Sequence, residues 1–185
     1  MDVIYIVGQV IGFIAMALII ISFQIKKPVM MVLMQCAAQV CFTVHFFMIG
    51  SVSGAVQNLI SVVRGVFLAS GVKALRSRPM MFVFAGIYAV SPVVMGLVIP
   101  GKSIEILDFL PAIAMMVNTF CIWDLNSKRH RLSQLFVASP LWIAYDAISR
   151  SYSGIITELF NAVSSLIFLI RIRAFSRKRG SERKE

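Results

Sequence analysis

Charged residues are few in this sequence. Only 14% of its 185 residues are Asp, Glu, Lys or Arg, whereas 59% are hydrophobic, and the mean hydropathy is +0.87. A soluble domain of this length buries one core beneath a charged surface, and the charge present here is too little to cover one. The composition therefore excludes an ordinary soluble domain.

The motifs of familiar enzymes and metal sites are also missing. The three cysteines, Cys36, Cys41 and Cys121, all fall within apolar segments, where they act as small hydrophobic side chains rather than as disulfides or zinc ligands. There is no GxSxG, P-loop, HExxH or paired-cysteine motif. The sequence thus predicts no enzyme, no bound cofactor and no metal site.

Long apolar runs are abundant instead. Runs of about 18 or more residues recur along the chain, and each can cross the roughly 30 Å hydrocarbon layer as a helix. The strands of a membrane β-barrel would alternate in polarity, and runs such as 10–21 do not. We predict an all-α integral membrane protein with seven transmembrane helices. These spans are 3–24, 29–49, 53–72, 80–99, 104–123, 133–149 and 154–172.

The distribution of basic residues predicts the orientation of the chain. Of its 18 Lys and Arg residues, 15 follow the first, third, fifth and seventh spans. Only Lys102 and Arg150 fall on the other side, and Arg64 lies within a span. Because basic loops stay in the cytoplasm, we predict that the N-terminus is outside and the C-terminus is cytoplasmic.

The formal net charge of +10 comes mostly from the predicted cytoplasmic loops and from the tail 173–185, which we predict to be disordered. This charge needs no nucleic-acid partner, because it retains the loops in the cytoplasm. The tail can in addition contact anionic headgroups of the lipid bilayer, although retention alone is the simpler explanation.

One pattern occurs twice in the chain. A shift of 100 residues places Ser53-Gly54 on Ser153-Gly154, and a helical segment with one polar stripe follows each glycine. The matched positions are Gly54/Gly154, Gln57/Thr157, Asn58/Glu158, Ser61/Asn161, Arg64/Ser164 and Gly65/Ser165. We predict two parallel triple-helix repeats. They would comprise 1–72 and 104–172, joined by a loop and linker span at 73–103 and followed by the basic tail 173–185.

Arg64 is the sharpest candidate for function, because polar groups inside spans are costly and face a bundle interior or a wet cavity. It lies about 16 Å into its span, close to the midplane. An arginine there needs a partner, water or a substrate anion. Glu158 is the leading acidic partner, ahead of Asp146 and Asp108. Such a pair would either lock the two halves together as a salt bridge or bind substrate.

Other polar residues extend the candidate site. His45 and Asp146 lie near the outer ends of their spans, one residue apart in the repeat register, and with Glu158 they are the candidate proton-linked residues. The alternative for His45 is a hydrogen-bonded histidine inside the bundle. Trp142 lies within its span, where it can face a ring-shaped substrate. The amides of Gln35, Gln39 and Asn118 would either hold helices together or line a path for a hydroxylated solute.

Several residues resemble a known family. The matching features are Val44-His45-Phe46-Phe47, Gly50, Gly54-Ala55, Arg64, and Glu158 thirteen residues before Arg171. In these features, and in length and hydropathy, nearly the whole chain is similar to the YgjV family of bacterial inner-membrane proteins. The resemblance implies a multi-pass protein of the bacterial inner (plasma) membrane.

The three-one-three plan also resembles the SWEET and PQ-loop superfamily, in which two triple-helix bundles flank a central cavity and substrates cross by alternating access. Phe23-Gln24 is similar to the Pro-Gln end of a PQ-loop helix, with Phe in place of Pro, and Trp123-Asp124 departs further. Pro111 and Pro140 match hinge prolines in the second repeat, whereas the first repeat has none there. This resemblance implies a small-solute carrier.

Two functions from different classes follow. The first is a carrier of a small polar or anionic metabolite, with a cavity between the third and seventh spans. Its candidate substrate-binding residues are Gln57, Asn58, Ser61, Arg64, Trp142, Glu158 and Asn161. The second is a non-transporting protein whose polar stripe holds the bundle, or a homo-oligomer, together. A water-accessible pocket between those spans favours the carrier, and a dry seam favours the structural role.

Overall fold

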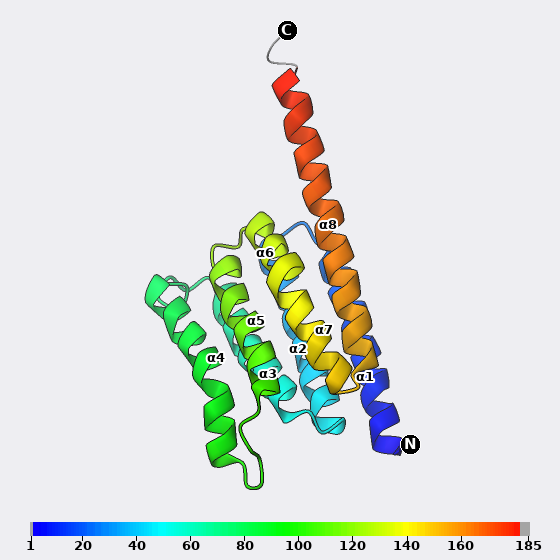
Figure 1. Ribbon diagram of the computed structural model, residues 1–185. Coiled ribbons are helices and arrows are strands. Elements are labelled where there is room, and N and C mark those ends of the chain that lie inside the picture. Colours follow the sequence, from blue (N-terminus) through cyan, green and yellow to red (C-terminus); the bar gives the residue numbers. More distant parts are fainter. Residues whose placement is uncertain (1, 182–185) are drawn as a thin grey trace.

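The computed structural model describes residues 2–181, and over this range the chain is helical between short turns (Figure 1). The elements are α1 (Val3–Ser22), α2 (Pro28–Met48), α3 (Val52–Ala69), α4 (Arg78–Val98), α5 (Ile106–Ile122), α6 (Ser127–Ser133), the π-helix η1 (Gln134–Ala138), α7 (Ser139–Ile148) and α8 (Tyr152–Ser181). Because α6, η1 and α7 follow one another without a break, they form one rod. The prediction of an all-helical protein is confirmed for the described residues.

The first five helices begin and end within three residues of the predicted spans. Local sequence explains these bounds. Pro28 and Pro79 lie in the first turns of α2 and α4, where a missing backbone N–H leaves no hydrogen bond unmade. Gly50 and Gly101 follow α2 and α4 with φ of +79° and +78°, a backbone conformation that favours glycine.

Two helix bounds differ from the predictions. The rod of α6, η1 and α7, which corresponds to the predicted sixth span and is called the sixth rod below, begins at Ser127 rather than at residue 133. Its start is capped by the Asn126 side chain, which accepts hydrogen bonds from the backbone N–H of Lys128 (3.0 Å) and of Arg129 (3.2 Å). The prediction that the chain becomes disordered at residue 173 is wrong as far as Ser181, since α8 continues to that residue. Extending an existing helix costs little, and Arg, Lys and Ala favour it.

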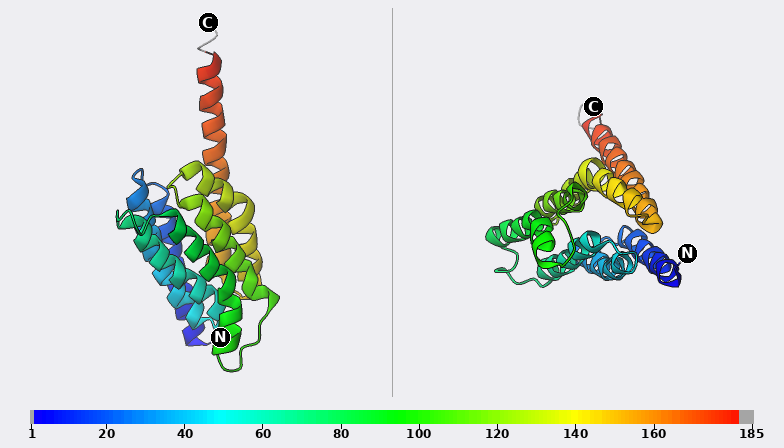
Figure 2. Two further views of the ribbon diagram at one scale, coloured as in Figure 1. Left: turned by 90° about the vertical axis from the view of Figure 1, so that its left-hand side faces the viewer. Right: turned by 60° about the horizontal axis from the view of Figure 1, so that its bottom comes forward.

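The helices form a ring. Helices that are consecutive in the chain pack against each other, and the ring closes where α1 contacts α8. Helix α4 packs outside, against α3 and α5. Viewed toward one end of the bundle, α1, α2 and α3 form one row, and the remaining helices form a second row that faces it (Figure 2). The space between these rows holds the candidate site.

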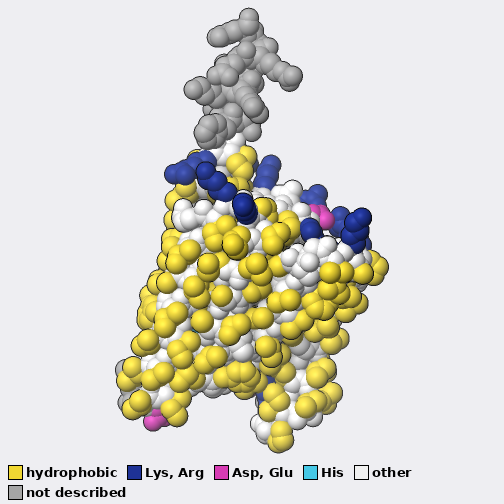
Figure 3. Space-filling view, turned by 180° about the vertical axis from the view of Figure 1, so that it is seen from behind, with side chains coloured by type: hydrophobic (Ala, Val, Ile, Leu, Met, Phe, Trp, Pro, Cys, Tyr) yellow, Lys and Arg dark blue, Asp and Glu magenta, His cyan; other side chains and the backbone are white. Residues whose placement is uncertain are grey.

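The surface of the bundle suits a membrane. Five helices, α1, α2, α3, α4 and α8 as far as Arg173, are long and apolar enough to cross one, and α5 is a shorter apolar helix. Apolar side chains cover the visible flank, and basic side chains gather at the end where α8 leaves the bundle (Figure 3). We call this the basic end, and the opposite end, where α1 begins, the N-terminal end.

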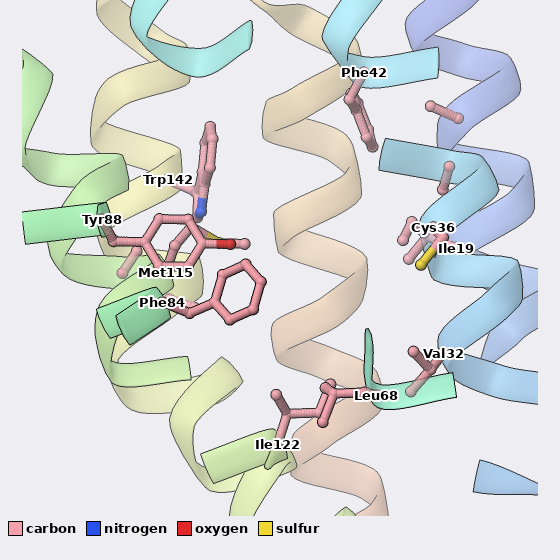
Figure 4. Packing of buried hydrophobic residues seen from close by; sticks show 14 of the residues in the cluster. Ile19, Val32, Cys36, Phe42, Leu68, Phe84, Tyr88, Met115, Ile122 and Trp142 are labelled. Carbon is pink, nitrogen blue, oxygen red and sulfur yellow. The ribbon is translucent and has the colours of Figure 1, made fainter. Parts of the chain in front are cut away.

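Buried apolar side chains from both rows of helices form one core cluster. In the view of Figure 4, Phe84, Tyr88 and Met115 of α4 and α5 lie on one side, and Cys36 and Phe42 of α2 on the other. Phe46 of α2 packs on Trp142 of α7, with ring centroids 5.7 Å apart, and so connects the two rows. Both rows therefore contribute to a single core.

Candidate functional site: a polar cavity inside the helix ring

A polar cavity lies inside the ring. Its volume is about 80 Å³, which is space for a few water molecules, and every helix except α4 contributes to its wall. Ten of the 18 lining residues are polar, and none is Lys or Arg. The polar ones are Gln35, Gln39, Asn58, Asn118, His130, Gln134, Asp146, Thr157, Glu158 and Asn161.

A π-helical turn shapes the part of the wall made by the sixth rod. Ser139 donates its backbone N–H to the carbonyl of Gln134, five residues earlier, and Pro140 follows without an N–H to continue the α-helical pattern. The wider turn places residues five apart one above the other, and the Gln134 amide lies 3.1 Å from Ser139 Oγ. Both side chains thereby reach the same point on α8.

That point is Glu158. Its Oε2 accepts hydrogen bonds from Gln134 Nε2 at 2.8 Å and from Ser139 Oγ at 2.7 Å, and its Oε1 accepts one from Asn161 Nδ2 at 3.1 Å. Donors on η1, α7 and α8 therefore fix a half-buried carboxylate at the cavity wall. Hydrogen bonds to the ionised form stabilise its charge.

Two other lining oxygens have no partner. Asp146 is 1% exposed and Asn161 is 5% exposed, yet Asp146 Oδ1 and Asn161 Oδ1 receive no hydrogen bond from any described residue. Buried polar atoms are normally satisfied, so an exception at a cavity wall calls for an explanation. Both atoms are acceptors, which means that the cavity lacks donors at these two places.

Aromatic rings form the wall beside Asp146. Phe46 packs against Trp142 with ring centroids 5.7 Å apart, and Phe42 follows on the same helix at 6.1 Å from Phe46. All three rings line the cavity. Trp142 and Asp146 are four residues apart on α7 and so share a face. One part of the cavity thus combines a carboxyl group with three aromatic side chains.

The wall at the basic end contains an amide and an imidazole. The side-chain carbonyl of Asn118 accepts a hydrogen bond of 2.9 Å from His130 Nδ1. α5 and α6 therefore each offer the cavity a polar side chain at this end.

Arg131 lies beside this wall, where α1, the sixth rod and α8 contact one another. Its guanidinium lies 3.8 Å from the centre of the Phe23 ring and 5.3 Å from that of Phe168, and it donates a hydrogen bond of 3.0 Å to Ser164. The end of α1, the start of the sixth rod and the middle of α8 meet at this residue.

A family model described as a bacterial inner membrane protein, Imp-YgjV, matches residues 6–176. The chain belongs to this family. The Imp-YgjV description gives a location, so the protein is placed in the bacterial inner membrane, as the resemblance of its residues predicted. No curated protein and no solved structure matches the chain.

The structure brings together some of the predicted site residues of this Imp-YgjV chain and separates others. Asn58, Trp142, Glu158 and Asn161 line the cavity, as does Asp146. Gln57, Ser61 and Arg64 do not line it. Instead Gln57 Nε2 lies 2.7 Å from Ser91 Oγ, and the hydroxyls of Ser61 and Tyr88 are 2.7 Å apart. These residues hold α3 against α4.

The Arg64 side chain contacts α4 and α5 rather than the cavity. It is 2% exposed, its Nη1 donates to Thr119 Oγ1 at 2.7 Å, and its guanidinium lies 5.5 Å from the centre of the Tyr88 ring. The expected pair with Glu158 does not form, because Arg64 extends between α4 and α5 whereas Glu158 is held by η1 and α7. Asp108 does not pair with Arg64 either, because its carboxylate forms an ion pair of 3.0 Å with Lys102.

His45 lies at the N-terminal end, outside the cavity lining. It is fully buried, with Nδ1 2.8 Å from the carbonyl oxygen of Gly8 and Nε2 2.8 Å from Ser151 Oγ. Since a carbonyl oxygen only accepts, Nδ1 carries a proton and donates it to Gly8. His45 thus connects α1 and α2 to the turn before α8, which agrees with the alternative of a hydrogen-bonded histidine.

Sequence reasoning missed several lining residues. His130 lies outside the predicted span 133–149, and Gln134 lies inside it but is not among the predicted site residues. A signal for both exists in the sequence, since Asn126 is a helix cap and His130 and Gln134 are one turn apart on the face that also carries Ala138. Phe42 and Phe46 gave no such signal, because aromatic residues are common in any apolar helix.

Proposed function

We propose that this inner-membrane protein is a carrier that moves a small polar solute through the central cavity by alternating access. The supporting observation is a polar cavity lined by both rows of helices, beneath an apolar outer surface. Polar groups that only held helices together would pair with one another, whereas Asp146 Oδ1 and Asn161 Oδ1 are left for a ligand or water. In this proposal seven spans cross the membrane, with the basic end in the cytoplasm.

Two separate seams would have to open in turn. At the N-terminal end, His45 contacts Ser151, and the Gln9 amide donates to the carbonyl of Arg150 at 2.9 Å. At the basic end, Arg131 packs on Phe23 and Phe23 stacks near Phe160. Because the cavity lies between these two sets of contacts, opening either set alone would expose it to one side.

The wall favours a neutral or cationic solute over an anionic one. It contains two carboxyl groups and no Lys or Arg, and Arg64, the residue expected to attract an anion, points elsewhere. Burying an anion beside carboxylates would be strongly unfavourable. We therefore retain a polar metabolite as the proposed solute and set aside an anionic one.

Matching turns support the proposed repeat of two triple-helix units. The backbone N–H of Ser51 donates to the carbonyl of Phe46 at 2.8 Å, and that of Ser151 donates to the carbonyl of Asp146 at 2.9 Å. The preceding residues, Gly50 and Arg150, both have positive φ, +79° and +55°. A repeated unit places one substrate site between two similar halves, which is the arrangement an alternating-access carrier uses.

The structural alternative has support in the first half of the chain. There the stripe residues Gln57, Ser61 and Arg64 are paired with α4 and α5, as polar residues that assemble a bundle would be. In the second half, Thr157, Glu158 and Asn161 line the cavity instead. One stripe thus serves assembly, and we assign the carrier function to the other.

A thiol-accessibility experiment tests the carrier without knowledge of its solute. The three cysteines are replaced by alanine, and single cysteines are introduced as Thr157→Cys, which lines the cavity, and Ser61→Cys, which is equally buried in the α3–α4 seam. We expect a membrane-impermeant maleimide to label the first variant in both right-side-out and inverted vesicles and to leave the second unlabelled.

Ser61→Cys is a matched control, because both positions are nearly inaccessible in the closed structure and both lie within helices. If Thr157→Cys is labelled from neither side, or from one side only under all conditions, the cavity does not alternate and the structural role replaces the carrier.

The orientation is tested by fusions to the C-terminus. We expect a C-terminal green fluorescent protein to fluoresce in the inner membrane and a C-terminal alkaline phosphatase to be inactive, because 15 of the 18 basic residues lie in segments predicted to face the cytoplasm. A phosphatase fused after Lys102, in the turn between α4 and α5, should be active. The reverse pattern would invert the proposed topology.

A further inference from the structure

The wall of the cavity has a charge and a pattern of free acceptors that specify a ligand more closely than polarity does. Asp146 and Glu158 both line it together with His130, and its other polar residues are uncharged: three glutamines, three asparagines and one threonine. The ion pairs of the described residues involve Arg78, Lys102 and Arg129, and none reaches these two acids. The protein thus supplies no cation to its own cavity carboxylates.

Asp146 has the stronger need for such a cation. Glu158 receives three hydrogen bonds, whereas Asp146 Oδ1 is buried and receives none from the described residues. A buried carboxyl oxygen without a donor is poorly solvated, and a ligand that brings a positively charged donor to Oδ1 stabilises the carboxylate form of Asp146. The second free oxygen, Asn161 Oδ1, also requires a donor.

The aromatic wall supplies a second interaction of the same kind. Trp142 lies one helical turn from Asp146, and Phe46 packs on Trp142 with centroids 5.7 Å apart. The faces of aromatic rings attract cations, and the attraction grows in a desolvated site. A carboxylate next to an indole is thus a suitable place for an ammonium group.

The two free acceptors are separated along the cavity. Asp146 packs against Gly154 of α8, and Asn161 is seven residues further along that helix, a rise of about 10 Å. A ligand that satisfies both must carry donors at two ends, about the length of a short aliphatic chain apart.

We propose that the cavity binds a small organic cation with an ammonium group at one end and a second hydrogen-bond donor at the other, the ammonium lying between Asp146 and Trp142. This proposal rests on the proposed carrier function for its biological meaning, but binding alone decides whether it is right.

The test uses three ligand series of equal chain length on the full-length protein purified in detergent. The cationic series runs from 1,4-diaminobutane to 1,7-diaminoheptane, the neutral series consists of the corresponding diols, and the anionic series of the corresponding dicarboxylates. A ligand that binds only the folded state raises the melting temperature with the logarithm of its concentration. We expect this rise for the diamines, and no rise for the diols or dicarboxylates.

Matched variants locate the ammonium. Asp146→Asn should weaken diamine binding at least about 30-fold, because it removes a buried charged partner without changing its shape. Trp142→Leu should weaken it by about 3-fold to 10-fold, and Trp142→Phe should restore most of the affinity. Asp108→Asn is the control, because it also removes a buried carboxylate but lies outside the cavity, paired with Lys102. It should leave the affinity unchanged.

The outcomes separate this inference from the carrier proposal. Stabilisation by diols or sugars but not by diamines would overturn the organic cation and leave a neutral-solute carrier. An equal loss of affinity in Asp146→Asn and Asp108→Asn would show that the effect is not local to the cavity and would also overturn it. Diamine binding that depends on Asp146, without uptake of the bound diamine into proteoliposomes, would support the site and reject transport.

Discussion

The substitution Gly12→Ala is expected to lower the melting temperature of the purified protein by about 2–12 °C. A Cβ atom at residue 12 would overlap Ser153 Oγ and would lie 2.8 Å from His45 Nδ1 and 2.9 Å from Ser153 Cβ. Rotating the serine hydroxyl away does not move its Cβ atom, and both hydrogen bonds of His45 hold its ring in place. Overpacking of this kind costs about 1–3 kcal/mol, and about 2–4 °C accompanies each kcal/mol for a chain of this length.

A second glycine provides the control for this prediction. Gly86 of α4 has no atom within 4 Å of the place where its Cβ would lie, so Gly86→Ala should be neutral or stabilising through helix propensity alone. The measurement is the melting temperature of both variants in the same detergent. Equal effects at the two positions would mean that α1 and α8 do not approach as closely as the structure shows.

A compensating change identifies the contact responsible. Ser153→Gly removes both the hydroxyl, which has no hydrogen-bond partner among the described residues, and the Cβ atom. In the double variant Gly12→Ala/Ser153→Gly, α1 gains a methyl group and α8 loses a side chain at their contact, so the glycine now lies on α8 instead of α1. We expect at least half of the lost stability to return, which a double-mutant cycle measures as a coupling between the two sites.

The sequence predicted the helices well because their limits are encoded locally. Apolar length, prolines in first turns and glycines with positive φ act within a few residues, and they placed α1 to α5 closely. The same kind of information exists for the sixth rod, since Asn126 marks its start, but the basic residues Lys128, Arg129 and Arg131 predict a cytoplasmic loop there. A cytoplasmic helix end and a cytoplasmic loop have similar charge.

The partners of polar side chains could not be predicted in the same way. Arg64 and Glu158 share a stripe in the repeat register, and a twofold relation between two equal halves would place these stripes face to face. In the structure α4 packs against α3 and forms hydrogen bonds with Gln57 and Ser61 of the first stripe. The two stripes therefore contact different helices. Which helix covers which face depends on packing over the whole ring, and no local pattern encodes it.

In the proposed repeat, the two halves are joined at equivalent positions. Residues 45 and 145 are equivalent in the shift of 100, and each crosses to the start of a helix in the other half. His45 of α2 contacts Ser151 before α8, and the hydroxyl of Tyr145 of α7 accepts the backbone N–H of Gly54 in the first turn of α3 at 2.7 Å. First-turn amides have no partner within their own helix, so the Tyr145 contact satisfies a group that α3 leaves free.

We therefore expect His45→Ala to open the cavity toward the N-terminal end. In the cysteine-free background, maleimide labelling of Thr157→Cys from that side should become at least about 10-fold faster, which corresponds to a loss of about 1.4 kcal/mol from the closed state. That loss is within the range for one or two buried hydrogen bonds. Labelling from the basic end should slow down, because the same cavity cannot be open to both sides in an alternating-access carrier.

The control for His45→Ala is Thr43→Val on the same helix. Thr43 donates its only side-chain hydrogen bond to Gln39 of α2 itself, at 2.8 Å, so its loss affects no seam between the halves. Tyr145→Phe should act like His45→Ala, because it removes the equivalent crossing contact at the same, N-terminal end. If both His45→Ala and Tyr145→Phe lower the melting temperature yet leave labelling from each side unchanged, the two contacts stabilise the fold without closing the cavity. A change in labelling with the sign given above would mean that one buried histidine and one buried tyrosine set the balance between the two open states.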